Sequence, residues 1–413
     1  MKKRVVITGY GCITPIGLNP QDFWRGLIEG KSGIGPITLF DTKEFPTTIG
    51  AEIKGFEPEK YISRKEVRRV DPYTQYAIAS AKQAVEHAQL SITEEIAERV
   101  GVIVGSGSGG MNMVKEGYQT LSEKGPKRIS SYLSSGMLIN SAAGEISIIF
   151  GAKGPSSAVV TACATASSCI GEGMRMIQYG TADVMIVGGA EGDCTPLDLG
   201  SFSKIRALSR RNDEPTKASR PFDKDRDGFV LGAGAGVLVI EEAEFAMKRG
   251  ATILAELVGY GATTDAYHIT APDPEASQQA RAIRMAIEES GMTPDEIDYV
   301  NAHGTSTQLN DQLETTAIKK ALGERAYEIP VSSIKSSIGH LLGGAGAVEL
   351  IATICAIQEQ KVPPTLNLDE PEEGLDLNYV PYQPLEVPVR AAISNSFGFG
   401  GHNVCLAVRK WEE

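Results

Sequence analysis

An internal repeat limits the fold of this chain more than any other feature of its sequence. Residues 9–14 (GYGCIT) and residues 259–264 (GYGATT) each follow an apolar run. TEEI at 93–96 and TPDEI at 293–297 each precede a strand-like run, and a third pair joins a strand to a helix around Cys163 and around residues 335–340. Three matches in the same order indicate a duplicated unit. We predict two closely packed halves, residues 1–250 and 251–413, because no Pro- or Ser-rich linker lies near Gly250.

Strand-like and helical segments alternate through both halves. The predicted strands are residues 100–104, 158–161, 184–187, 237–240, 253–258 and 300–302. Asp71 followed by Pro72 is typical of a helix start, and Pro274 is predicted to open another helix. The pattern predicts an α/β fold whose strands are largely buried.

Composition narrows the class of protein and its compartment. The chain of 413 residues is 42% hydrophobic and 22% charged with a net charge of −12, which excludes disorder and argues against a nucleic-acid-binding surface. We see no apolar run near the roughly 18 residues that span a bilayer. The six cysteines lack paired spacing, as in proteins of reducing compartments. We therefore predict a cytoplasmic protein without stable membrane insertion.

The strongest candidate site is Cys163, in the segment 161–167 (TACATAS) between a predicted strand and a predicted helix. Free backbone N–H groups and the helix dipole at such a junction favour a thiolate. The small neighbouring residues leave room for a substrate to reach the sulfur. We predict a nucleophile at Cys163 and ordinary buried packing for Cys12, Cys355 and Cys405.

Two of the five histidines lie in loops of small residues at strand ends. His303 lies in 301–307 (NAHGTST), and His340 lies in 335–346 (KSSIGHLLGGAG). If the halves are duplicated, Cys163 and His340 occupy equivalent strand–helix junctions and can face each other. His87 and His268 are interpreted as structural residues.

The glycine-rich segment 394–403 (SNSFGFGGHN) is the third candidate element. Glycine-rich backbone beside two aromatic residues suits an exposed N–H donor next to an apolar wall, as in an oxyanion hole. A plain glycine-rich turn would explain the same residues.

Two other motifs resemble a dinucleotide-binding sequence and a calcium-binding loop, and both interpretations are rejected. Residues 105–110 (GSGSGG) fit a dinucleotide-binding pattern, but no strand ending in an acidic residue follows about 20 positions later. Residues 223–228 (DKDRDG) mimic a calcium loop, whose twelfth position here is Gly234 instead of the required Glu. We therefore predict no metal site and no dinucleotide cofactor.

Together, the Cys163, His303, His340 and 395–401 motifs are similar, in order, to those of the beta-ketoacyl-acyl-carrier-protein synthases, most of all the elongating type II enzymes. The segment 219–229 (SRPFDKDRDGF) also fits that family, and the resemblance covers essentially the whole chain. It implies a thiolase-like, five-layered αβαβα fold and a homodimer.

The resemblance also implies an acyltransferase activity in fatty acid chain elongation. Cys163 would take an acyl group from acyl carrier protein, and malonyl-acyl-carrier protein would lose carbon dioxide to form an enolate. The enolate would attack the acyl group on Cys163 and give 3-oxoacyl-acyl-carrier protein. The backbone N–H groups of Cys163 and Phe399 would form the oxyanion hole, and His303 and His340 would stabilise the malonyl thioester oxygen. Beyond phosphopantetheine, which arrives on the carrier protein, the resemblance implies no cofactor.

Further residues take supporting roles from the resemblance. Lys335 would organise the site electrostatically, and Asp311 and Glu314 would anchor Lys335. Phe397 and Phe399 belong to the acyl pocket and its gate, together with Ser108, which stands where many type II enzymes carry a bulky apolar residue. A basic cluster would steer the acidic carrier protein, although a solvated face is the simpler interpretation; it consists of Arg64, Lys65, Arg68 and Arg69.

Alternatives stay open at this point. A thiolase would need a second catalytic Cys in the C-terminal glycine-rich loop, where this chain has His402. Initiating synthases use Cys-His-Asn, which His340 argues against. A non-catalytic, chain-length-setting partner subunit of a polyketide-type synthase usually lacks the nucleophile, whereas Cys163 is present.

Overall fold

The computed structural model describes residues 2–412, and ten strands form one mixed sheet in the order β10-β9-β13-β14-β8-β1-β7-β6-β4-β5. The strands are β1 Val5–Ile13, β4 Val100–Gly105, β5 Ser156–Ser157, β6 Val184–Glu191, β7 Gly234–Glu242, β8 Ala255–Thr264, β9 Tyr299–Asn301, β10 Val331–Ser332, β13 Ala391–Gly398 and β14 His402–Arg409. The order β5-β4-β6-β7-β1 of the first half recurs as β10-β9-β13-β14-β8 in the second, as duplication predicts. Antiparallel pairing of β1 with β8 joins the half-sheets.

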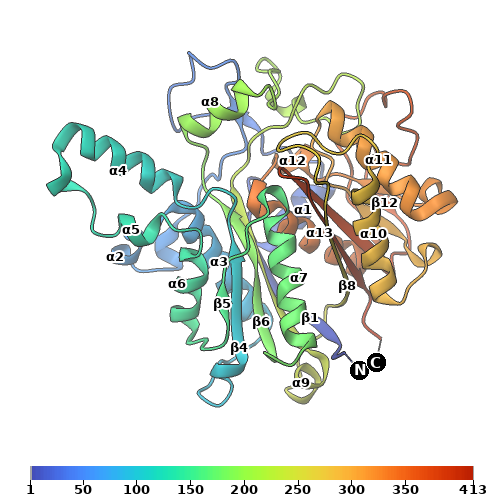
Figure 1. Cartoon of the computed structure of the whole chain (residues 1–413), viewed down its shortest axis with the longest axis horizontal. Coiled ribbons are helices and arrows are strands. Elements are labelled where there is room, and N and C mark those ends of the chain that lie inside the picture. The colour runs from blue at the N-terminus through green and yellow to red at the C-terminus, as the bar shows by residue number, and fades with distance from the viewer. Residues whose placement is uncertain (1, 413) are drawn as a thin grey trace.

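Helices cover both half-sheets and fill the space between them (Figure 1). The central layer is α7 (Thr165–Gln178) and α13 (Ala345–Glu359), which contact each other and strands of both halves. The outer layers are α3 (Pro72–His87) and α6 (Ser141–Phe150) on the first half, and α10 (Ser277–Ser290) and α11 (Gln308–Leu322) on the second. The predicted five-layered αβαβα arrangement is confirmed.

The central helix α13 corrects one expectation about apolar runs. Residues Leu342–Glu359 are long and apolar enough to cross a membrane by length and composition. However, 89% of that window is buried inside the protein, as in the core helix of a folded domain. The apolar composition therefore reflects a helix packed on all sides by the two halves.

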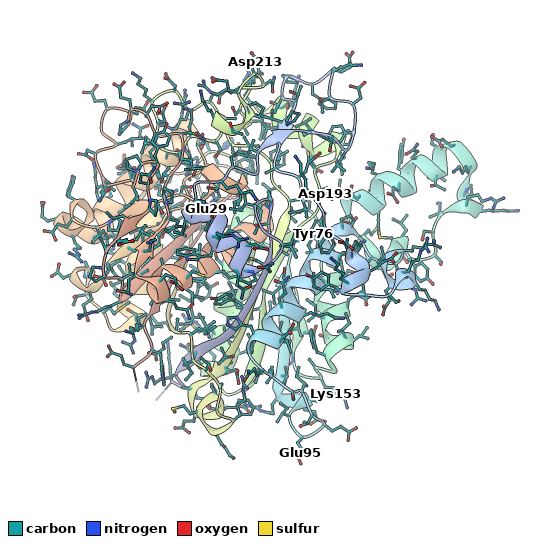
Figure 2. The ribbon with its side chains drawn as sticks, turned by 180° about the vertical axis from the view of Figure 1, so that it is seen from behind. Glu29, Tyr76, Glu95, Lys153, Asp193 and Asp213 are labelled. Carbon is teal, nitrogen blue, oxygen red and sulfur yellow. The ribbon has the colours of Figure 1, made fainter. Side chains whose placement is uncertain are left out.

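The remaining α-helices and strands complete the fold. They are α1 Pro20–Ile28, α2 Arg64–Val67, α4 Met111–Lys124, α5 Leu133–Gly136, α8 Pro196–Lys204, α9 Ala243–Lys248, α12 Lys335–Ile338, and the strand pairs β2 Gly35–Pro36 with β3 Ile49–Gly50 and β11 Lys361–Val362 with β12 Leu385–Glu386. Helices α4 and α5 project from the body as an arm (Figure 1). Near the base of that arm the Tyr76 hydroxyl donates to Asp193 at 2.7 Å (Figure 2).

Several predicted elements differ in their bounds, and two of them have a clear structural reason. Residues 158–161, which are predicted as a strand, are not in a strand. The strand at this place is β5, Ser156–Ser157, which ends before them and pairs with β4. Helix α10 begins at Ser277 instead of Pro274, because Ala276 has a φ of 51° and so breaks the helical conformation. Gly250, at the predicted boundary between the halves, lies between α9 and β8.

The junctions before the two central helices match residue by residue. A short 3-10 helix precedes each: η4 (Ala162–Ala164) before α7 and η8 (Leu342–Gly344) before α13. Each begins on a non-glycine residue with positive φ, 50° at Ala162 and 42° at Leu342. The second-half equivalent of Cys163 is therefore Gly343, and His340 lies three residues before it at the equivalent junction.

Candidate active site

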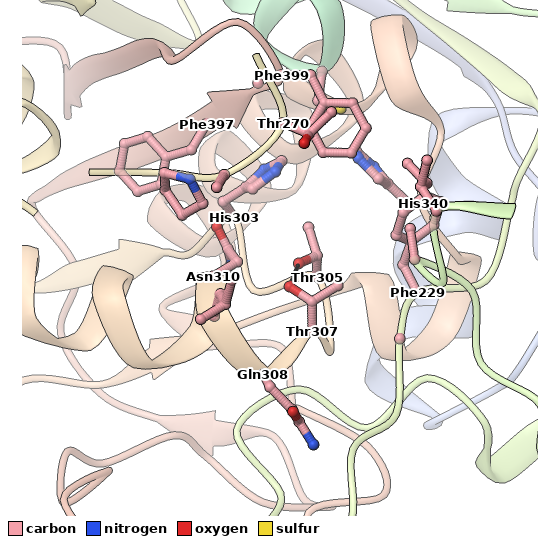
Figure 3. Close-up of a pocket in the computed structure, with 18 of the residues that line it drawn as sticks. Phe229, Thr270, His303, Thr305, Thr307, Gln308, Asn310, His340, Phe397 and Phe399 are labelled. Atoms are coloured by element: carbon pink, nitrogen blue, oxygen red, sulfur yellow. Dashed lines mark hydrogen bonds between the residues drawn. The ribbon is translucent and has the colours of Figure 1, made fainter. Parts of the chain in front are cut away.

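A cavity of about 490 Å³ lies where the two halves meet, and the predicted nucleophile and both histidines line it. Its other walls include Phe202, Phe229, Thr305, Thr307, Phe397 and Phe399. The imidazole rings of His303 and His340 approach the cavity from opposite sides, near the ring of Phe399 (Figure 3). Segments from both halves are needed to build this space.

Cys163 lies in η4, directly before the N-terminus of the buried helix α7. Burial raises the pKa of its thiol to about 12, while the Lys335 charge and the backbone N–H of Phe399 act in the opposite direction. We therefore expect a neutral thiol in the free protein, in contrast to the thiolate that the helix N-terminus alone predicts. Cys163 also packs in an apolar cluster with Leu342 and Phe202, which gives the sulfur a largely apolar environment.

The two histidine rings meet edge to face with their centroids 5.3 Å apart. Burial lowers the pKa of both rings well below 6.5, and the nearby Lys335 charge lowers both further. Both rings are therefore neutral at physiological pH, and each presents one N–H donor. Phe397 packs against His303 and Phe229 against His340, with centroids 6.0 and 5.3 Å apart.

Lys335 is buried beside His303 and forms an ion pair with Glu349 of α13. Its Nζ also lies 2.6 Å from the carbonyl oxygen of His303 and 3.3 Å from its Nδ1. The prediction that Asp311 and Glu314 anchor Lys335 is therefore wrong. Glu349 was missed, although an acidic residue within the apolar run 345–357 was the available signal.

Asp311 and Glu314 both lie on α11. They support the loop that carries His303, and they do not anchor Lys335. Glu314 accepts the N–H groups of His303 at 2.8 Å and Gly304 at 2.7 Å. Asp311 accepts the N–H of Ser306 at 3.2 Å. Both carboxylates thus hold the backbone of the 303–306 turn.

The glycine-rich segment approaches the nucleophile through its backbone. A Cβ on Gly398 would lie 3.0 Å from the backbone nitrogen of Cys163, so only glycine allows this approach. The N–H of Phe399 interacts with the Cys163 thiol, and the Phe399 side chain lines the cavity. The Phe399 backbone therefore lies beside the nucleophile.

Ser108 is not brought to the wall of this cavity, unlike Phe397. It lines a separate cavity of about 20 Å³ together with Cys194 and Leu342. Leu342 lines this small cavity and packs in the same apolar cluster as Cys163. The structure therefore does not place Ser108 and the nucleophile in one continuous pocket.

The predicted basic cluster spans the short helix α2 and the residues after it. Arg64 pairs with Glu59 at 3.8 Å, and the Arg69 guanidinium lies 5.0 Å over the ring of Tyr132. Lys65 is exposed, and Arg68 lines a second cavity of about 360 Å³ with Arg128 of the arm. Arg128 could not be assigned to this cluster from the sequence, because α2 and the arm meet only in the folded protein.

Within residues 2–412 no three His, Cys, Asp or Glu side chains gather as a metal-binding group. The polar groups that line the cavity suit chemistry that uses a thiol, imidazole rings and backbone N–H groups.

A duplicated αβαβα core with a cysteine at one helix junction and two histidines facing it defines the condensing enzymes of the thiolase fold. Two family descriptions match in succession, "Beta-ketoacyl synthase, N-terminal domain" over residues 2–246 and "Beta-ketoacyl synthase, C-terminal domain" over residues 254–369. The chain belongs to the beta-ketoacyl synthase family.

Relatives and solved structures agree with this assignment. The chain is 51% identical over 411 residues to 3-oxoacyl-acyl-carrier-protein synthase 2 of Synechocystis sp., covering 100% of this chain and 99% of the relative. It is 49% identical over 409 residues to the protein of the same name from Coxiella burnetii, covering 99% of each. A beta-ketoacyl synthase from Burkholderia phymatum superposes with a TM-score of 0.92 at 36% identity, covering 99% of this chain and 100% of the other. A ketosynthase in complex with its type II polyketide acyl carrier protein superposes with the same TM-score at 33% identity, covering 100% of each chain.

Proposed function

We propose that this protein elongates acyl chains by condensing malonyl-acyl-carrier protein with an acyl group held on Cys163. The observation that carries the proposal is the meeting of Cys163, His303 and His340 in one cavity. The relatives named 3-oxoacyl-acyl-carrier-protein synthase 2, similar over nearly their whole length, support fatty acid elongation as the setting.

In the first half-reaction the Cys163 sulfur attacks the thioester carbonyl of an acyl carrier protein. The carbonyl oxygen becomes an oxyanion, which the backbone N–H groups of Cys163 and Phe399 stabilise. The carrier thiolate leaves and takes up the proton that the Cys163 thiol gives up. The product is acyl-Cys163 and a free carrier thiol.

In the second half-reaction the malonyl thioester loses carbon dioxide, and the electrons of the broken C–C bond form an enolate. Neutral His303 and His340 donate N–H hydrogen bonds to the enolate oxygen, where negative charge develops. The enolate carbon attacks acyl-Cys163, expels the sulfur, and forms the 3-oxoacyl product. The Cys163 thiolate then takes one proton from solvent, which restores the thiol.

Acyl carrier protein is the proposed partner, docking near the basic cluster, and it brings the phosphopantetheine arm, so that the protein itself needs no further cofactor. Arg68 and Arg128 face the same surface cavity, and acidic partners are steered by such charges. The solved complex of a ketosynthase with its acyl carrier protein supports this choice.

A homodimer in the cytoplasm is the proposed assembly and location. The strand β5 lies at one edge of the sheet, and exposed apolar residues lie on the elements beside it. They include Ile148 of α6 at 77% exposure and Val160, which follows β5 closely, at 43%. Large exposed apolar side chains beside an unpaired strand edge are typical of a subunit interface.

The test is intact-protein mass after mixing with a medium-chain acyl carrier protein, followed by peptide mapping and a chase with malonyl-acyl-carrier protein. We expect an acyl adduct on Cys163 that disappears as a chain two carbons longer is released. An adduct that forms but is not consumed contradicts the condensing step. If Cys163 takes no acyl group, a non-catalytic partner subunit becomes the better interpretation.

A further inference from the structure

Glu191 is a buried carboxylate at the end of β6 that touches both halves of the protein. Its Oε2 accepts the backbone N–H of Gly107 and that of Gly343, each at 2.9 Å. Its Oε1 accepts the N–H of Ser108 at 3.0 Å and the hydroxyl of Ser106 at 3.1 Å. The carboxylate therefore fills a nest of neutral donors, three of them backbone N–H groups.

The duplication shows what this nest corresponds to in the other half. Strands β6 and β13 occupy equivalent places in the sheet and each has eight residues. Each ends opposite the first residue of the next strand, Glu191 opposite Gly234 and Gly398 opposite His402. Glu191 is therefore the counterpart of Gly398.

The residues that these two positions face are counterparts as well. Gly343 occupies in η8 the place that Cys163 occupies in η4. A Cβ on Gly398 would point at the Cys163 nitrogen from 3.0 Å, and the Glu191 side chain reaches the Gly343 nitrogen. At the catalytic junction a glycine leaves the Cys163 N–H open, whereas at the equivalent junction a carboxylate binds the Gly343 N–H.

The geometry points to Glu191 as a positioning residue: a buried carboxyl group that accepts the N–H of Gly343, the counterpart of the Cys163 N–H of the oxyanion hole, and thereby fixes the turn after His340. This inference rests on the proposed function, since the oxyanion hole is assigned through it. Glu191 acts through other groups and does not line the substrate cavity.

Two contacts carry the effect of Glu191 to the reacting groups. The Gly343 N–H that Glu191 holds belongs to η8, whose first residue, Leu342, packs beside Cys163 and has a strained φ of 42°. An ionised Glu191 also raises the pKa of the Cys163 thiol through its charge. Loss of the carboxylate should therefore change both the position of the turn and the titration of the thiol.

The space between the backbones of Gly107 and Gly343 is small, which explains why a carboxylate and no larger group fills it. A Cβ on Gly343 would lie 2.2 Å from the nitrogen of Gly107, so the two backbones are pressed together around the carboxylate. Formate, the smallest carboxylate, is thus the suitable probe for the space that Glu191→Ala would open.

The experiment compares Glu191→Ala, Glu191→Gln and the wild type in elongation assays with and without sodium formate, with sodium chloride as the salt control. We expect kcat of Glu191→Ala to fall on the order of 10–100-fold, because small displacements of reacting groups are costly, while KM for the acyl carrier protein changes little. Formate should restore a large part of that loss. Glu191→Gln should show a similar loss without rescue, because its amide fills the space and presents N–H groups to donors.

Glu256→Ala is the matched control, because Glu256 is also a buried strand carboxylate but pairs with Arg4 and Arg409 far from the cavity. It should lose stability and keep activity, with no response to formate. Full activity in folded Glu191→Gln, or a loss in folded Glu191→Ala that formate leaves unchanged, overturns the inference.

A second readout needs neither substrate nor the proposed reaction. The rate of Cys163 alkylation by iodoacetamide should rise at lower pH in folded Glu191→Gln than in the wild type, because a nearby negative charge is gone. An unchanged alkylation profile overturns the inference even if Glu191→Ala does not fold. A wild type that alkylates normally but does not elongate contradicts the proposed function instead, so the two failures are distinguishable.

Discussion

Nζ of Lys335 lies 3.3 Å from Nδ1 of His303, and this contact determines which nitrogen of the ring carries the proton. An ammonium group only donates hydrogen bonds, so Nδ1 must accept and the proton must be on Nε2. The remaining Nζ hydrogens go to the His303 carbonyl oxygen and to Glu349. Lys335 therefore prepares His303 as a donor and needs Glu349 to remain buried with its charge.

Replacing Lys335 by Met should damage both stability and chemistry. The change leaves Glu349 without its partner, and breaking a buried pair costs about 3–5 kcal/mol of unfolding free energy. The double variant Lys335→Met/Glu349→Gln should regain most of this stability in denaturant titrations. Its release of carbon dioxide from malonyl-acyl-carrier protein should stay low, because the His303 tautomer is no longer held. Wild-type decarboxylation by the double variant would show that Lys335 has only a structural role.

Removing either histidine should separate the two half-reactions. In His303→Ala or His340→Ala the enolate oxygen loses an N–H donor, and losses of this kind lower kcat on the order of 10²–10³-fold. Acylation of Cys163 uses backbone donors and should stay near the wild-type rate. Rapid-quench measurements of acyl-enzyme formation and of carbon dioxide release check this. A variant that fails at acylation but decarboxylates normally contradicts the assigned roles.

Cys163→Ala should abolish condensation while binding of acyl carrier protein persists. The variant lacks the sulfur that carries the acyl group, and the docking surface lies elsewhere. Calorimetry and product analysis by mass spectrometry measure the two properties. Cys194→Ala is the matched control, because Cys194 packs in the same apolar cluster and should remain largely active. Product formation by purified Cys163→Ala would falsify the nucleophile assignment.

The stability of the protein should fall as pH rises from about 4.5 to about 7. Burial raises the pKa of Glu314 to about 7, so the folded state holds a proton that the unfolded chain has already lost in this range. Asp71 behaves in the same way, with its pKa also raised to about 7 by burial. Each group contributes a slope of up to about 1.4 kcal/mol per pH unit. Denaturant titrations of Glu314→Gln should show about half of the combined slope, and an unchanged slope contradicts the burial argument.

Charge at the basic cluster should govern capture of the carrier protein. The double variant Arg68→Ala/Arg128→Ala should raise KM for acyl carrier protein several-fold at low salt. It should leave kcat nearly unchanged, because the two arginines lie outside the cavity that contains Cys163. The difference from the wild type should shrink as salt screens the charges. Arg281→Ala, an exposed change on α10, is the control and should have no effect. Equal KM values at low salt place the carrier elsewhere.

The duplicated α/β core could be predicted from the sequence because it depends on local patterns. The strand-like runs at 100–104 and 184–187 are continuous apolar segments and appear in β4 and β6. The Asp71–Pro72 signal opens α3, where the Asp71 side chain accepts the N–H of Tyr73. Residues in small-residue loops at strand ends, such as Cys163 and His303, were recognisable for the same reason.

Pairings between distant residues could not be predicted in this way. Asp311 and Glu314 follow the His303 loop closely in the sequence, yet Lys335 pairs with Glu349, across the turn between α12 and α13. Ser108 was placed in the acyl pocket by resemblance, yet it lines a small separate cavity that does not include the nucleophile.

The sequence by itself determined which segments form strands and helices, that they are repeated, and which side chains can carry acyl-transfer chemistry. Hydrophobic periodicity, capping residues and glycine positions are properties of a few consecutive residues, so they can be recognised in the sequence without a structure. Only the tertiary structure decided that Gly343 is the counterpart of Cys163 and that Glu191 accepts the Gly343 N–H. Those relationships depend on how the two halves pack, because burial and long-range contacts set both the partner and the protonation of every group in the site.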